Sequence, residues 1–187
     1  MVDVVEYQPG WPARFEELRA AYARALEAAG VPYRGIEHVG STSVPGLAAK
    51  PVIDVDVVVA GSDVERASDA LESIGFVPRG DLGVADRYAF DPPERFAPTH
   101  TYVVVEGTLS LRNHLAVRDT LRADPGLRDE YAAVKRQAAR TASDIDEYIL
   151  LKSEVLGRIL RRGGLSEDER ASIADTNRGI TARGARG

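Results

Sequence analysis

The chain has 187 residues, of which 44% are hydrophobic and 28% charged, and this is enough for one globular domain with a buried core. Its formal net charge of −5 gives no overall attraction to nucleic acid or to an anionic membrane surface. The absence of cysteine excludes disulfides, thiolate metal sites and cysteine nucleophiles. No apolar stretch is long enough for a secretion signal or a membrane span, so we expect a cytoplasmic protein without membrane contacts.

The first part of the chain predicts alternating helices and strands. Phe15, Leu18, Tyr22 and Leu26 recur at spacings of three and four, which is typical of an amphipathic helix, and Gly30 ends it. Residues 52–60 are rich in Val and Ile and form the clearest strand. In chain order we expect a helix over 11–29, a strand over 33–39, a loop over 40–51 with a helical turn near 47–49, a strand over 52–60, a helix over 63–74, and strands over 76–78, 87–90 and 100–105.

The remainder of the chain shows helical spacing over 109–121, 126–139 and 144–161. Residues 163–187 are rich in Gly, Arg, Ser and Asp and poor in apolar side chains, which predicts a mobile tail. We therefore expect an α+β fold, a mixed-sheet α/β domain over residues 1–162 with a helical C-terminal third. The strand over 52–59 should be central in a sheet of four or five strands.

Two carboxylates lie in the clearest strand. Asp54 and Asp56 alternate with Val and Ile, so their side chains project from the same face about 6–7 Å apart. Two like charges in an apolar strand are unfavourable unless a cation lies between them. Oxygen ligands on a rigid strand suit Mg²⁺, or Mn²⁺ in its place. A half-exposed strand with Asp on its wet face explains the same pattern equally well.

The loop before this strand has the composition of a phosphate site. Gly40 allows the backbone to turn sharply and approach a ligand, and Ser41, Thr42 and Ser43 supply hydroxyl and backbone N–H groups. Lys50 is either a phosphate partner or an exposed turn residue. The loop is not a Walker A motif, because Lys50 precedes a proline, and it lacks the flanking glycines of a nucleophile elbow. A phosphate loop beside paired carboxylates is what phosphoryl or nucleotidyl transfer requires.

The run from His38 to Asp54, HVGSTSVPGLAAKPVID, resembles the signature of the GrpB family, which is similar to the nucleotidyltransferase superfamily. The resemblance covers about residues 5–160. It continues in YQPGW at 7–11, VRDTLR at 117–122 and YAAVK at 131–135, and more loosely at Tyr148 and Lys152.

This resemblance implies a nucleotidyltransferase-like mixed sheet, with Gly40, Ser41, Asp54 and Asp56 in the positions of that superfamily's active-site motif. A related domain fused to dephospho-coenzyme A kinase implies a link to nucleotide or cofactor metabolism. Two departures stand out on the strand that starts at His100. It carries no third carboxylate, and Tyr102 stands where the family tends to have a second histidine.

Other polar residues have both a functional and a structural interpretation. His38 should point into the site, and His100 is a candidate third metal ligand or phosphate contact, whereas His114 is interpreted as structural. Arg118 and Arg122 lie on one helical face and either clamp a triphosphate or form a solvated surface. The pairs Tyr131/Lys135 and Tyr148/Lys152 are interpreted as packing positions with exposed head groups.

The leading hypothesis is a metal-dependent nucleotidyltransferase that uses a nucleoside triphosphate and acts on a small-molecule or macromolecular acceptor. A catalytically silent nucleotide- or metabolite-binding module and a metal-dependent hydrolase remain as alternatives. If the first hypothesis holds, a single cleft should be lined by His38, Ser41, Asp54, Asp56, His100 and at least one of Arg118 and Arg122, with Tyr102 as a further candidate.

Overall fold

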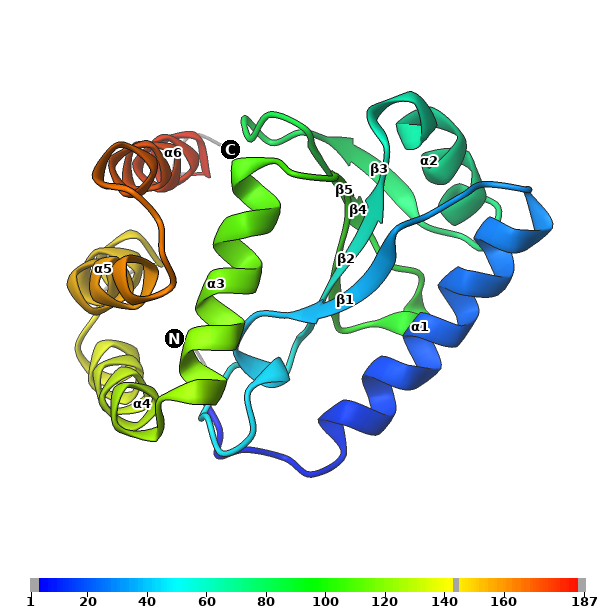
Figure 1. Ribbon diagram of the computed structural model, residues 1–187. Helices are drawn as coiled ribbons and strands as arrows, with labels where there is room; N and C mark the ends of the chain where they lie inside the picture. Colours follow the sequence, from blue (N-terminus) through cyan, green and yellow to red (C-terminus); the bar gives the residue numbers. More distant parts are fainter. Residues whose placement is uncertain (1–3, 143–144, 185–187) are drawn as a thin grey trace.

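The computed structural model describes residues 4–142 and 145–184 and contains one five-stranded mixed sheet (Figure 1). The strands are β1 (Gly35–Val39), β2 (Ile53–Val59), β3 (Val77–Gly80), β4 (Arg87–Asp91) and β5 (Thr99–Val105), in the order β1-β2-β5-β4-β3. β2 and β5 run parallel, and the other neighbours are antiparallel. The expected strand over 52–60 is therefore internal, although β5 and not β2 occupies the centre. The fold class is α+β, as the order of elements predicts.

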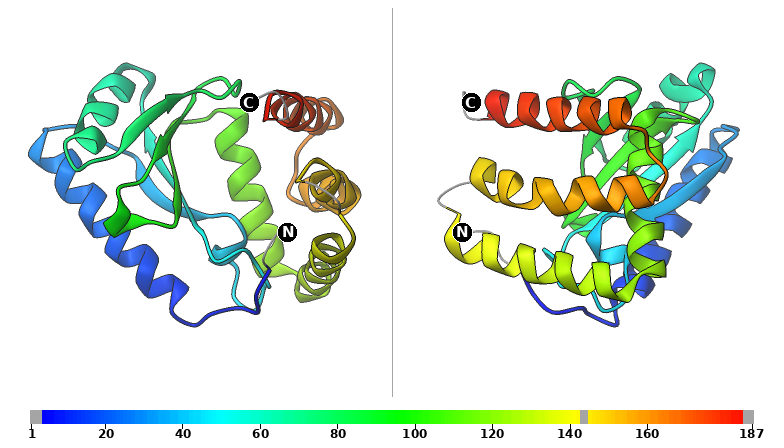
Figure 2. Two further views of the ribbon diagram at one scale, coloured as in Figure 1. Left: turned by 180° about the vertical axis from the view of Figure 1, so that it is seen from behind. Right: turned by 60° about the vertical axis from the view of Figure 1, so that its left-hand side comes forward.

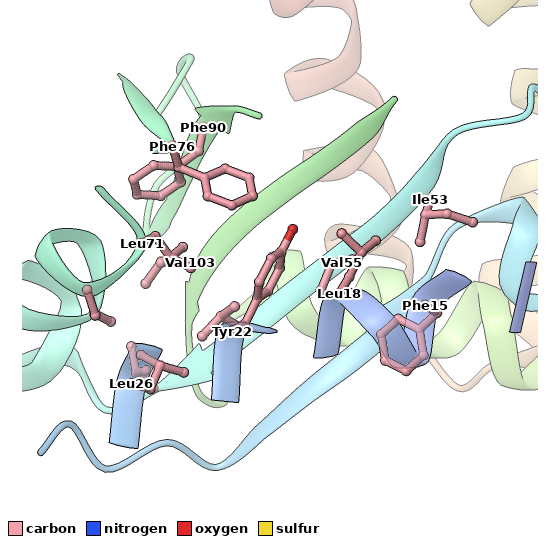
Figure 3. Packing of buried hydrophobic residues seen from close by; sticks show 14 of the residues in the cluster. Phe15, Leu18, Tyr22, Leu26, Ile53, Val55, Leu71, Phe76, Phe90 and Val103 are labelled. Carbon is pink, nitrogen blue, oxygen red and sulfur yellow. The ribbon is translucent and has the colours of Figure 1, made fainter. Parts of the chain in front are cut away.

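Helices α1 (Trp11–Ala28) and α2 (Val64–Glu72) cover one face of the sheet (Figure 1). The apolar stripe of α1 packs on the Ile and Val side chains of β2 that point to this face, and Phe76 and Phe90 extend the core toward α2 (Figure 3). Tyr22 is fully buried here, and its hydroxyl lies 2.7 Å from Thr101 Oγ1. This core fixes which face of β2 is apolar, and therefore which face carries the two aspartates.

The opposite face of the sheet is crossed by α3 (Leu109–Ala123). Beyond α3, the helices α4 (Pro125–Thr141), α5 (Ile145–Arg162) and α6 (Glu167–Gly184) lie side by side as a further layer (Figure 2). Three short 3₁₀ turns complete the fold: η1 (Ser41–Ser43), η2 (Gly61–Asp63) and η3 (Glu94–Phe96). The helical turn expected near 47–49 is instead η1, directly after Gly40. None of the described helices combines the length and apolar character that crossing a bilayer requires.

The expected mobile tail is wrong over most of its length, because residues 167–184 form α6. Its start is a capping box in which Glu169 N–H donates to Ser166 Oγ at 3.2 Å and Ser166 N–H donates to Glu169 Oε2 at 2.9 Å. Leu165 and Ile173 are buried against Leu160. The pattern Ser-x-x-Glu was visible in the sequence. The segment has few apolar residues, so the helix has little buried face and no clear hydrophobic periodicity predicted it. Residues 185–187 lie outside the described part of the chain.

Candidate functional site

The two aspartates of β2 project from the face of the sheet that α3 only partly covers. Asp54 pairs in register with His100 of β5, and Asp56 pairs with Tyr102. Asp54 keeps 27% of its side chain exposed, whereas Asp56 is fully buried. The same strand face therefore presents one accessible and one inaccessible carboxylate.

Gly40 brings the loop after β1 directly against Asp54. Its backbone angles, φ +68° and ψ −172°, belong to a region that only glycine adopts readily. A Cβ atom at this position would lie 2.1 Å from Asp54 Oδ2. The glycine is therefore required twice, for the conformation of the turn and for the close approach of the carboxylate.

Two of the three hydroxyl groups of η1 hold the loop, and the third faces a pocket. Ser43 Oγ donates to the Gly40 carbonyl at 2.6 Å, and Thr42 Oγ1 donates to the Val52 carbonyl at 3.2 Å. These two bonds hold the loop in its turn. The Ser41 hydroxyl makes no hydrogen bond within the described residues, and it faces the pocket described next.

A pocket of about 120 Å³ opens between this loop and helices α4 and α5. Hydroxyl groups and basic groups dominate its lining, with one carboxylate among them. The lining residues are Ser41, Thr42, Lys50, Val52, Asp54, His100, Lys135 and Lys152. Three ammonium groups around one carboxylate give the pocket a positive balance, which suits phosphate.

Two of the three lysines come from the helical layer and are held in unusual surroundings. Lys135 is 3% exposed and donates from Nζ to the Ala48 carbonyl at 2.7 Å. Burial lowers the pKa of Lys135 to about 7, and burial together with the neighbouring Lys50 lowers the pKa of Lys152 to about 8. A bound anion would favour the charged form of both groups.

Sequence reasoning missed these two lysines. The interpretation of Lys135 and Lys152 as packing residues with exposed head groups is wrong, because their ammonium groups line the pocket. Each follows a tyrosine by four residues, at Tyr131 and Tyr148, and this repeated spacing was the signal available. Helical spacing shows which residues share a face, but not which neighbour that face meets.

Each aspartate has a histidine partner. His100 Nδ1 lies 2.9 Å from Asp54 Oδ1, and His114 Nδ1 of α3 lies 2.7 Å from Asp56 Oδ2. The hydrogen bond with Asp54 raises the pKa of His100. Burial lowers the pKa of His114, but the charge and hydrogen bond of Asp56 outweigh it and the net shift is upward. His100 is half exposed, so its Nε2 atom remains free to meet a substrate.

The two carboxylates differ in what they can offer a divalent cation. Asp56 Oδ1 is buried and has no hydrogen-bond partner within the described residues, but it is closed to solvent and does not line the pocket. Over the same residues, no group of three or more His, Asp or Glu side chains is arranged to hold a metal. Of the two carboxylates only Asp54 lines the pocket, so a cation there would take its remaining ligands from water and substrate phosphate. His100, which was expected as a third ligand, has its Nδ1 atom engaged with Asp54.

The expected single cleft is wrong for four of its members. Arg122 donates twice to the Ser43 carbonyl, at 3.0 and 2.8 Å, and so supports η1 from behind. Arg118 is held by Glu37 and Asp119 and also donates to the His38 carbonyl. Neither arginine lines the pocket, and α3 with His114 separates Asp56 from it.

Side-chain alternation along β1 sends His38 to the far face of the sheet, where its ring stacks on Phe15 at 4.6 Å. Its Nε2 atom lies 3.1 Å from Thr42 Oγ1, so it positions the loop from within the core. Tyr102 contributes to a neighbouring hollow of about 140 Å³ that shares His100 with the pocket.

The burial of His38 gives a first prediction. Desolvation lowers its pKa to about 4, so protons bind the unfolded chain more readily and stability falls as the pH drops below 6.5. Between pH 7 and pH 4 this shift removes about 3 kcal/mol of unfolding free energy. Urea titrations at several pH values give the unfolding free energy of the wild type and of His38→Gln, and the difference between the two pH profiles measures this loss. Parallel profiles would contradict the assignment.

The family model described as GrpB protein matches residues 1–162. A UPF0157 protein of Halalkalibacterium halodurans is 35% identical over 164 residues, which cover 86% of this chain and 82% of that protein. UPF0157 protein YqkA of Bacillus subtilis is 33% identical over 155 residues. The match covers 82% of this chain but only 44% of YqkA, so the chain spans less than half of that relative.

A dephospho-CoA kinase of Mycolicibacterium paratuberculosis is 31% identical over 179 residues, which cover 81% of this chain and 43% of that protein. Among solved structures, conserved protein GrpB from Enterococcus faecalis has a TM-score of 0.72 and 32% identity, covering 86% of this chain and 98% of that one. The Cid1 poly(U) polymerase has a TM-score of 0.54 and 19% identity, covering 79% and 50%, and therefore shares the fold alone. The chain belongs to the GrpB family and has a nucleotidyltransferase-like fold.

Proposed function

We propose that this protein binds the phosphate chain of a nucleoside triphosphate in the pocket between η1 and the lysines of α4 and α5, and transfers the nucleotidyl group to an acceptor. The observation that carries the proposal is the position of Asp54. It is pressed against the Gly40 backbone at the edge of a pocket lined by Ser41, Lys135 and Lys152. A carboxylate beside a phosphate site is the arrangement that nucleotidyl transfer needs.

The lysines supply the binding energy for the phosphates. Lys135 and Lys152 are partly desolvated, so their attraction to an anion is stronger than that of exposed lysines. The shared fold with a polymerase described as MgGTP-bound supports the choice of a nucleoside triphosphate. A divalent cation held by Asp54 would neutralise the charge that develops on the phosphates.

The transfer itself forms a bond between an acceptor oxygen and the α-phosphorus and breaks the bond to the β-phosphate, so pyrophosphate leaves. The acceptor must give up a proton in this step. His100 is the candidate base, because Nδ1–H can donate to Asp54 while Nε2 takes the proton. In this proposal the Asp54–His100 pair replaces the third carboxylate that the strand lacks.

A second candidate is a nucleotide- or metabolite-binding module that has lost catalysis. The observation that favours it is the complete burial of Asp56 and its pairing with His114. A carboxylate that is already neutralised by a histidine has less need of a cation. In this case phosphate would bind through the lysines alone.

The two candidates are separated by pyrophosphate release. The full chain is incubated with each ribonucleoside triphosphate, with Mg²⁺ or EDTA, and with a small-molecule extract of bacterial cells as the acceptor source. Transfer predicts Mg²⁺-dependent pyrophosphate release that His100→Asn lowers at least tenfold with little change in nucleotide affinity. Lys152→Met should instead weaken affinity. Binding without any pyrophosphate release favours the second candidate, and the absence of nucleotide binding contradicts both.

A further prediction concerns pH. Because the pKa values of Lys135 and Lys152 are about 7 and 8, both lysines lose charge as the pH rises from 6 to 9. Sulfate keeps its charge over this range, so its affinity reports the protein alone. We expect calorimetry to give sulfate affinity at pH 9 at least tenfold below that at pH 6, with a flatter profile in Lys135→Met. An unchanged affinity would contradict the assigned roles.

A further inference from the structure

A second pocket lies beside the N-terminal half of α3. Its volume is about 440 Å³, and it is enclosed by the turn between β3 and β4, the N-terminal half of α3 and the middle of α6. In Figure 1 the turn between β3 and β4 and the start of α3 lie next to α6. The polar part of the lining consists of Asp86, Arg87, Ser110, Asn113, Ser172 and Thr176.

Two polar atoms in this lining are buried and unsatisfied. Arg87 Nε and Asn113 Oδ1 have no hydrogen-bond partner among the residues described. Leaving such groups unpaired inside a protein is unfavourable, and few native side chains do so without a ligand or a water. The two atoms are a donor and an acceptor, and both belong to side chains that line the same cavity.

Neighbouring contacts hold these side chains in place before any ligand arrives. The Arg87 guanidinium lies over the Tyr102 ring, 4.6 Å from its centroid, which orients it without using its N–H groups. An ion pair of 2.6 Å between Arg112 and Glu169 ties α3 to α6 next to the pocket. The turn is held by the Val105 N–H, which donates to the Asp86 carbonyl at 3.0 Å.

We propose that this pocket binds a small oxyanion, a phosphate ester or a carboxylate, that also carries hydroxyl groups. Arg87 supplies the charge, and its fork of N–H donors matches two oxygen atoms. The hydroxyls of Ser110 and Ser172 can donate to the same anion. Asn113 lines the same cavity, where its amide group can donate to a ligand oxygen. The exposed Asp86 at the edge disfavours a bare dianion and accepts a further ligand hydroxyl.

This site is independent of the proposed transfer site. None of its lining residues belongs to the pocket beside Asp54. One wall is α6, which lies beyond residues 1–162 that the family model matches. The ligand would therefore bridge the sheet domain and the C-terminal helix.

The test is a titration of the ¹⁵N-labelled full chain with glycerol 3-phosphate, and separately with citrate, followed by amide chemical shifts. We expect saturable shifts at Arg87, Ser110 and Ser172, and Arg87→Gln should weaken this binding at least tenfold. Lys152→Met is the matched control, because it affects the pocket beside Asp54 and should leave these shifts unchanged. Saturation by one probe assigns the anion as phosphate or carboxylate. Shifts confined to residues 40–43, or shifts that do not saturate with either probe, would overturn the proposal.

A second variant guards against a trivial loss of folding. Asn113→Leu removes a buried unpaired polar atom, so the ligand-free protein should melt at the same temperature or higher while binding of the probe is lost. A lower melting temperature with binding retained would show that Asn113 has a structural role and would contradict the site.

Discussion

Asp54→Asn should abolish the Mg²⁺-dependent part of nucleotide binding while leaving the protein folded. Asparagine keeps the shape of the side chain and can still accept a hydrogen bond from His100, but it no longer offers a charged oxygen to a cation. It also removes the repulsion between Asp54 and Asp56. The melting temperature without ligand should therefore rise or stay unchanged. At a ligand concentration of about a hundred times Kd, binding adds about 2.7 kcal/mol to the unfolding free energy of the wild type. The variant should lose the part of this gain that depends on Mg²⁺.

The measurement is a calorimetric titration of wild type and variant with nucleotide, in Mg²⁺ and in EDTA. In EDTA the variant should bind at least as tightly as the wild type, because one negative charge beside the phosphates is gone. Asp91→Asn is the matched control, since Asp91 is exposed on β4 and forms a surface ion pair with Arg79. If Asp54→Asn binds nucleotide with Mg²⁺ as the wild type does, Asp54 does not hold a cation.

Gly40→Ala should destabilise the protein by about 3 kcal/mol or more, and it should disrupt the pocket. The backbone of Gly40 has φ +68° and ψ −172°, which costs an alanine about 1–3 kcal/mol. The added methyl group would also lie 2.1 Å from Asp54 Oδ2, and overpacking of this kind costs about 1–3 kcal/mol. Urea-induced unfolding of the two proteins gives the difference in unfolding free energy.

Gly30→Ala provides a matched control. Gly30 has a similar φ of +63°, but nothing lies within 4 Å of the position of its added Cβ. Gly30→Ala should therefore lower the unfolding free energy only by the cost of the backbone conformation, about 1 kcal/mol. Replacing Asp54 by alanine in the Gly40→Ala background should recover the steric part. Equal losses of unfolding free energy in Gly30→Ala and Gly40→Ala would show that the contact with Asp54 does not contribute to the destabilisation.

The sequence by itself determined the elements and the loop of the site. The Val and Ile run of β2, the alternation of Asp54 and Asp56, and the glycine before Ser41 are local patterns, because strand period and turn conformation depend on adjacent residues. The helical C-terminal third follows from the same kind of pattern. These features were sufficient to identify the family and the fold class.

Only the tertiary structure decided what each side chain meets. Lys135 reaches the Ala48 carbonyl across 87 residues, and Asp56 reaches His114 across 58. Arg122 was expected at the phosphates and instead supports the Ser43 carbonyl. Periodicity shows which residues of a helix share a face, but the partner of that face depends on how α3, α4 and α5 pack on the sheet. Burial, charge pairing and the pKa of each lysine follow from that packing, because they depend on neighbours that are distant in the chain.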